Sequence, residues 1–156
     1  MAISMKINGK QQEIKFNYGL LFELNRRFEG VQGGNNGAGL IYSRMLSGDD
    51  SAIVDIIKTA TKVDDETAAQ AFGDYAESLN EDVLDGMNEA VQAFIDEVEY
   101  SGFFKREILK FTKQVQKGLE KLVVLKENAT DEMRKDELTA QIDSMEEMLE
   151  LLNSKN

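Results

Sequence analysis

The sequence predicts a mainly α (α+β) fold, in which an N-terminal β-hairpin packs on a bundle of short helices and a C-terminal antiparallel helical hairpin follows. Three observations predict this class. Apolar and polar residues alternate over residues 3–16, which is the period of a strand. Apolar residues recur every three or four positions over most of the remaining chain, which is the period of an amphipathic helix. The chain also contains no proline, so no helix is interrupted by that route.

The predicted β-hairpin turns at Asn8-Gly9, a dipeptide that accepts the positive φ angles of a two-residue turn. An isolated hairpin is marginal in water, so its apolar face needs a cover. Asn17 is suited to cap a helix that begins immediately afterwards, and we expect that helix to cover the hairpin. The apolar residues of this unit are Ile3, Met5, Ile7, Ile14 and Phe16 in the strands and Leu20, Leu21, Leu24 and Phe28 in the helix.

The stretch "GVQGGNNGAG", residues 30–39, contains five glycines in ten positions. A phosphate-binding loop is one interpretation, but the stretch lacks Gly-Lys-Ser/Thr and G-x-G-x-x-G and follows a helix instead of a strand. The sequence therefore predicts a flexible surface loop that faces a partner.

Short helices are predicted from residue 38 to residue 100. Their boundaries follow from stop and restart signals such as Ser47-Gly48-Asp49-Asp50 and from the cap at Asp64. The residues expected to face inward are Leu40, Ile41, Met45, Leu46, Ile53, Val54, Ile57, Ala68, Phe72, Tyr75, Val83, Met87, Val91, Phe94 and Val98.

Acidic residues cluster at 49–50, 64–66 and 81–82. Such carboxylates could form a metal site or an acid/base pair. Each cluster, however, lies at a predicted helix start, where acidic side chains cap the backbone and complement the helix dipole. We therefore interpret them as helix caps, and we expect no metal and no cofactor.

The C-terminal third predicts two long helices. Gly102 marks a break, after which Ile108, Phe111, Val115, Leu119 and Leu122 form one stripe. A turn with Thr130 as a cap leads into a heptad-like seam, which is typical of helices that pair. The seam either closes within its own hairpin or pairs with another chain in a homo-oligomer. Its residues are Leu138, Ile142, Met145, Leu149 and Leu152.

These patterns divide the chain into residues 1–102 (hairpin plus short helices), residues 103–153 (helical hairpin) and a frayed tail at 154–156. Phe103 and Phe104 stand at the junction beside Lys105 and Arg106. They are either an exposed aromatic anchor for a partner or a buried joint between the two parts.

Composition excludes several functions. Cysteine and histidine are absent, which removes thiolate metal sites, the commonest metal ligand and the usual general base. The net charge of −11 argues against nucleic acid as a partner. No apolar run reaches membrane-spanning length and no signal peptide is recognisable, so we expect a cytoplasmic binding protein without catalysis, not associated with membranes.

The first hundred residues resemble a known family. "MKINGKQQEIKFNYGLLFELNRRF", followed by a glycine-rich break and short helices, is similar to the tail assembly chaperones of long-tailed (siphovirus-type) phages of Gram-positive bacteria. The matching pattern is a strand, Asn-Gly-Lys, a second strand that ends in Lys-Phe-Asn, and a Leu-rich helix. It includes Ile7, Asn8, Gly9, Lys10, Ile14, Phe16, Asn17, Leu21, Leu24 and Asn25.

The resemblance implies an assembly factor of the host cytoplasm that is absent from the finished virion. Such proteins are thought to coat the tape measure protein, keep it soluble and bring tail tube subunits to it. A ribosomal frameshift commonly adds an extension that is thought to contact the tube protein, and Ser154-Lys155-Asn156 can be encoded by a slippery UCA-AAA-AAU. The alternatives are a structural virion protein, such as a head–tail or tail completion component, and a small coiled-coil adaptor.

Overall fold

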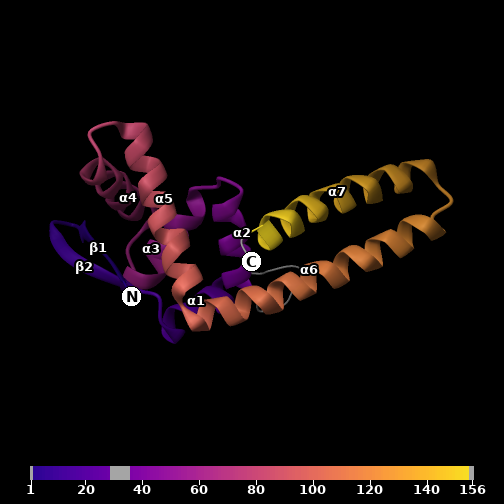
Figure 1. The fold of residues 1–156 in the computed structure, drawn as a ribbon, viewed down its shortest axis with the longest axis horizontal. Coiled ribbons are helices and arrows are strands. Elements are labelled where there is room, and N and C mark those ends of the chain that lie inside the picture. The colour runs from indigo at the N-terminus through magenta and orange to yellow at the C-terminus, as the bar shows by residue number, and fades with distance from the viewer. Residues whose placement is uncertain (1, 29–35, 155–156) are drawn as a thin grey trace.

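The computed structural model describes residues 2–28 and 36–154. In these ranges a two-stranded antiparallel sheet is followed by helices, and the last two helices form a long arm that projects from the body (Figure 1). The predicted fold class is confirmed. The elements are β1 (Ala2–Ile7), β2 (Lys10–Lys15), α1 (Tyr18–Arg27), α2 (Gly37–Leu46), α3 (Ser51–Thr61), α4 (Asp65–Leu79), α5 (Val83–Tyr100), α6 (Gly102–Asn128) and α7 (Glu132–Ser154).

The β-hairpin forms as the alternation predicts. Asn8 and Gly9 take positive φ angles of 53° and 77°, and Ile3 lies opposite Ile14 across the two strands. The apolar face of the hairpin is buried, but the cover is not the helix that we expected. β1 packs on α4 and α5 and β2 packs on α3, whereas α1 packs on α2, α3 and α6. The chain turns away at Asn17, so the apolar side of α1 meets other helices.

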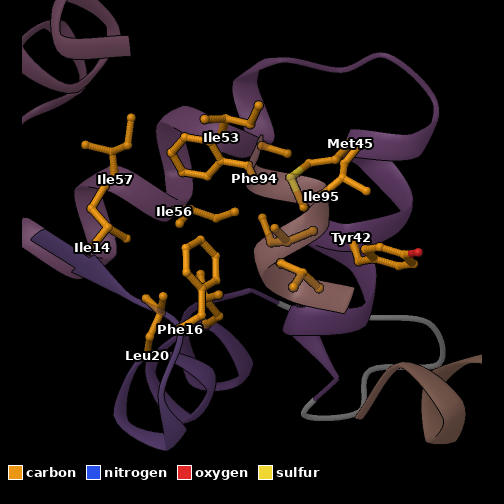
Figure 2. Packing of buried hydrophobic residues seen from close by; sticks show 14 of the residues in the cluster. Ile14, Phe16, Leu20, Tyr42, Met45, Ile53, Ile56, Ile57, Phe94 and Ile95 are labelled. Carbon is orange, nitrogen blue, oxygen red and sulfur yellow. The ribbon is translucent and has the colours of Figure 1, made fainter. Parts of the chain in front are cut away.

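Phe94 of α5 lies at the centre of the core. Its ring makes edge contacts with Phe16, Phe72 and Tyr75, with centroid distances of 6.0, 6.1 and 6.4 Å. Ile56 of α3 lies between Phe94 and Phe16, and Ile53 lies beside Phe94 (Figure 2). Edge-to-face aromatic pairs add to the free energy gained by burying the rings. One core therefore joins the hairpin to α3, α4 and α5.

The described end of the glycine-rich stretch is helical. Residues 30–35 lie outside the described residues, but Gly37, Ala38 and Gly39 begin α2 and are buried, so the prediction of a surface loop is wrong there. A Cβ on Gly39 would overlap the ring of Phe111, so glycine at this position lets α2 approach α6 closely. Asn25 of α1 accepts a hydrogen bond from the backbone N of Ala38 at 2.9 Å, which satisfies a free donor at the start of α2.

Two local predictions need correction. In α5, Val83 is exposed, while Ala90 and Gly86 are buried beside the expected Phe94 and Val98. Gly86 lies directly against the backbone of α4, since a Cβ at this position would overlap the carbonyl oxygen of Ala76. This close contact turns Gly86 toward α4 and leaves Val83 in solvent. At the start of α7, the side chain that accepts a backbone hydrogen bond belongs to Asp131, from Met133 N at 3.2 Å, and not to Thr130.

The arm consists of α6 and α7, which run antiparallel along each other (Figure 1). The first half of α6 also belongs to the main core, and so does the end of α7. The side chains of the arm that join the core are Phe104, Ile108, Phe111, Val115 and Leu152. The domain boundary at residue 102 stays a prediction, and these side chains make a truncation at that point its direct test.

Candidate partner-binding surfaces

Most of the residues predicted to bind a partner are buried within the chain. Phe104 is 1% exposed, and its ring lies 5.8 Å from that of Phe16. The seam of α7 faces inward: Leu138, Ile142 and Leu152 are buried and Met145 and Leu149 are partly buried. Phe103 differs from them, since it is 54% exposed. Phe104 is therefore a buried joint between the two parts, whereas Phe103 is exposed and stays a candidate anchor.

Phe103 belongs to an exposed aromatic patch, which we define as Tyr18, Phe22 and Phe103. Tyr18 and Phe22 lie one turn apart on α1 and are 59% and 51% exposed. The ring of Tyr18 meets that of Phe103 at 5.7 Å in a T-shaped contact. Side chains of this size are normally buried, so a group of them on the surface is a candidate interaction site.

Two side-chain hydrogen bonds fix the backbone next to this patch. The side chain of Asn17 accepts a hydrogen bond from Leu20 N at 3.0 Å and so fixes the start of α1. The hydroxyl of Ser101, at the N-terminal end of α6, donates to the carbonyl oxygen of Phe16 at 3.0 Å. The starts of α1 and α6 are therefore tied together, and the rings of Tyr18 and Phe103 meet before any partner binds.

A groove of about 550 Å³ lies beside the aromatic patch. Its walls combine aromatic and charged side chains, and within it Lys110 pairs with Glu107 at 3.2 Å. Such a groove can hold an apolar side chain of a partner while the cations at its edge meet a carboxylate. The lining residues are Tyr18, Leu21, Gly102, Phe103, Arg106, Glu107 and Lys110.

The outer side of α6 is basic. Five cations at spacings of three and four residues lie opposite the buried side of the helix. Among the described residues, 2–28 and 36–154, Lys110 is the one member of this row that forms an ion pair, and its partner is Glu107. No ion pair in these ranges joins α6 to α7. Most of the row is therefore available to acidic groups of another molecule. The row is Arg106, Lys110, Lys113, Lys117 and Lys121.

Two of the three acidic clusters supply a helix cap, as predicted. Asp64 accepts a hydrogen bond from Thr67 N at 2.8 Å, and Asp82 accepts one from Asp85 N at 3.0 Å. The Thr67 hydrogen bond holds the pKa of the Asp64 carboxyl below its usual value. No group of three or more acidic residues among residues 2–28 and 36–154 could hold a metal ion. Asp64 and Asp82 therefore cap α4 and α5, whereas Asp50 at the start of α3 makes no side-chain cap hydrogen bond.

One buried polar pair also belongs to the scaffold. The hydroxyl of Tyr42 donates to Glu99 at 2.9 Å, which links α2 to α5. Burial, together with the nearby Glu99 carboxylate, raises the pKa of the Tyr42 phenol above its usual value. The phenol is therefore a hydrogen-bond donor in a structural contact.

The fold and its surfaces define a helical protein whose exposed features suit the binding of other proteins. A family model described as "Phage tail assembly chaperone protein, TAC" matches residues 4–114, from the hairpin into α6. The chain belongs to this family of phage tail assembly chaperones, and the sequence resemblance is confirmed. Searches of curated proteins and of solved structures return no match.

The matched range includes the whole aromatic patch. The sequence analysis named Phe103 as a candidate but did not name Tyr18 and Phe22, although their spacing of four along a helix is visible in the sequence. Across the described ranges, no helix combines the length and the apolar content that crossing a bilayer requires.

Proposed function

We propose that this chaperone binds the tape measure protein of its phage, keeps it soluble during assembly and helps to recruit tail tube subunits, without catalysing a reaction. The observation that carries the proposal is the family match over residues 4–114. In this proposal the chaperone acts in the host cytoplasm and is absent from the mature virion. A tape measure protein is a long helical client, and an amphipathic helix presents apolar side chains at the spacing that an aromatic groove accepts.

The aromatic patch and its groove are the proposed client-binding surface. Rigid aromatic side chains lose little conformational entropy on binding, and they dominate many protein interfaces. The cations at the edge of the groove, Arg106 and Lys110, add contacts with acidic residues of the client. The side chains of the aromatic patch are exposed and are not part of the buried seam of α7, so client binding leaves the fold intact.

Co-expression tests the proposal. The full chain, expressed with the tape measure protein, is expected to raise the soluble yield of the client and to co-purify with it. The double variant Tyr18→Ala/Phe103→Ala is expected to lose both effects, because it removes two exposed rings. Met133→Ala, which removes an exposed apolar side chain at the far end of the arm, is the control and keeps both.

Unchanged client solubility and no co-purification at low salt would refute the proposal. Mass spectrometry of purified virions gives a second test. A chaperone is expected to be absent from them, whereas the protein at a fixed copy number would identify a structural component.

Tube recruitment is proposed to depend on a frameshifted extension. The messenger is expected to show a slippery heptamer, an overlapping minus-one frame and a long helix-rich reading frame soon after. Absence of both the overlapping frame and that reading frame would favour the structural or adaptor alternative.

A further inference from the structure

Apolar side chains hold α7 against α2 and α6. The helix runs along α6, and its C-terminal end reaches α2 on the body (Figure 1). Leu138, Ile142 and Leu152 are buried, and Leu152, which is 0% exposed, is part of the main core. Three further side chains of α7 pack against that core and are partly buried, and they are Met145, Met148 and Leu149.

The apolar residues of α6 and α7 are spaced alike on the two sides of their connecting turn. Five positions of α6 and five of α7 lie equally far along the chain from Thr130, so the antiparallel arrangement is expected to set them opposite each other. The opposed pairs are Ile108 with Leu152, Phe111 with Leu149, Val115 with Met145, Gly118 with Ile142 and Leu122 with Leu138. Spacings that alternate between three and four residues are typical of paired helices. We call these five α6 residues, together with the facing side of α2, the α7 groove.

The polar contacts of α7 stay within α7. Arg134 pairs with Glu137 at 3.4 Å, and Lys135 pairs with Glu132 at 3.7 Å. Within residues 132–151, no ion pair or side-chain hydrogen bond joins α7 to another helix. Apolar contacts are non-directional, and methionine side chains adapt to neighbours of different shape. The α7 groove can therefore exchange α7 for another helix with similar apolar spacing.

The family match separates the α7 groove from the helix that fills it. The matched range ends at residue 114, inside α6, and so it includes Ile108, Phe111 and the whole of α2. All of α7 lies beyond that range. The part of the chain that matches the family thus supplies one end of the groove, and α7 fills that end from outside the match.

We propose that the α7 groove is a second client-binding site and that α7 is its displaceable internal occupant. The client segment that it takes is an amphipathic helix with the chemistry of α7, which has apolar residues at spacings of three and four and an acidic outer side. From residue 138 to residue 154, α7 carries no basic residue, and the acidic ones are Asp143, Glu146, Glu147 and Glu150. The identity of the client rests on the proposed function.

The aromatic patch and the α7 groove would then be filled in that order. The patch needs no displacement, because Tyr18, Phe22 and Phe103 are exposed while α7 is in place. A short connection keeps α7 at an effective concentration on the order of millimolar, so a free helix competes with it poorly. A client already held at the patch gains the same advantage for its next segment. The α7 groove therefore opens to a bound client and stays closed to unbound helices.

Hydrogen exchange of the unchanged full chain tests whether α7 leaves its groove. Amides of α7 are expected to exchange faster than those of α5, because releasing α7 disrupts less of the core than unfolding does. Adding the tape measure protein should accelerate exchange in α7 further while α6 stays protected. A client that only stabilised the fold would slow exchange in both helices.

A fluorescently labelled peptide of residues 132–154 is the probe for the α7 groove, and it needs no client. Leu152→Asp in the full chain weakens the internal helix and is expected to raise affinity for the peptide at least about tenfold. Asn153→Asp is the control, because it adds the same charge at an exposed neighbour and should bind the peptide like the unchanged chain. A peptide carrying Glu146→Lys/Glu147→Lys should bind at least about threefold more weakly, since the basic row of α6 repels it.

A reversible lock covers the case in which Leu152→Asp does not fold. The chain has no cysteine, so Val115→Cys/Met145→Cys introduces the one pair that can form a disulfide between α6 and α7. Cysteine is itself a small apolar side chain, so the reduced form should fold. The oxidised form is expected to bind the tape measure protein at least about tenfold more weakly than the reduced form of the same sample.

Three results would overturn this inference: exchange in α7 as slow as in α5, equal peptide binding by Leu152→Asp and the unchanged chain, or equal client binding by the oxidised and reduced forms. Equal binding of the Glu146→Lys/Glu147→Lys peptide would overturn the acidic preference. Failure of the unchanged chain to bind the client refutes the proposed function instead, and the peptide and the client-free exchange measurement still test the groove.

Discussion

Phe103 and Phe104 are adjacent, chemically identical and oppositely placed, which makes them a matched pair for a stability test. Phe104 is 1% exposed and packs on Phe16, whereas Phe103 is 54% exposed and touches Tyr18. The perturbation is replacement of each by alanine in turn. If Phe104 joins the arm to the body, its loss weakens the whole fold, and the loss of Phe103 does not.

The expected magnitudes differ severalfold. Truncating a buried phenylalanine costs about 3–5 kcal/mol, because burial is lost and a cavity remains. That is a large part of the roughly 5–15 kcal/mol that stabilises a typical domain. Phe103→Ala should cost at most about 1 kcal/mol, since half of its ring is already in water. For a chain of this size each kcal/mol of lost unfolding free energy lowers Tm by about 2–4 °C, so Phe104→Ala should lower Tm by about 6–20 °C.

Urea denaturation followed by far-UV circular dichroism measures both free energies of unfolding. Adding Phe16→Ala, which should itself cost about 3–5 kcal/mol, completes a double-mutant cycle. The aromatic contact predicts a coupling of about 0.5–1.5 kcal/mol between Phe16 and Phe104. Equal losses for the two phenylalanine variants, or a loss below about 1 kcal/mol for Phe104→Ala, would refute the placement of Phe104 in the core.

Three further predictions follow from the same structure. Gly39→Ala should destabilise the fold by about 1–3 kcal/mol because its methyl group meets Phe111, whereas Gly73→Ala, whose Cβ meets nothing, should stabilise it by about 0.5–1 kcal/mol in urea melts. A chain that ends after residue 101 should lose its cooperative thermal transition, and a retained transition would support a domain boundary at 102. Hydrogen bonds from Ser51 and Arg44 hold the pKa of the Asp49 carboxyl below its usual value. The stabilisation that the Asp49 carboxylate contributes is therefore present above about pH 4 and is lost as the pH falls further. Asp49→Asn should lower the free energy of unfolding at neutral pH and flatten the acid limb of a plot of stability against pH.

Several parts of this fold follow from local sequence because neighbouring residues alone decide them. The turn at Asn8-Gly9 needs two residues that accept positive φ, and both take it. Asp64 and Asp82 cap helices because a carboxylate at that position reaches a free backbone N–H three residues on. The family itself was recognisable from the order of such local features, and the match over residues 4–114 confirms it.

The sides of the helices were only partly predictable. Adjacent residues on a helix point about 100° apart, so only one of Phe103 and Phe104 could face the core. Phe104 lies four residues before Ile108 and so extends its stripe, which was a usable signal. In α5, two neighbouring stripes were both apolar enough to be buried. Gly86 closely approaches the carbonyl oxygen of Ala76, and Val83 is exposed, while Met87, Val91, Phe94 and Val98 of the predicted stripe are buried or partly buried.

Local sequence was sufficient to predict the hairpin, the helices with most of their caps, and the family. It could not show which elements cover the hairpin, why Gly39 is buried or which aromatic residues share a surface. These features depend on pairs of residues that are distant in sequence, such as Gly39 with Phe111 and Tyr18 with Phe103. A local pattern reports which side of an element is apolar, whereas the packing of the whole chain selects the partner of that side.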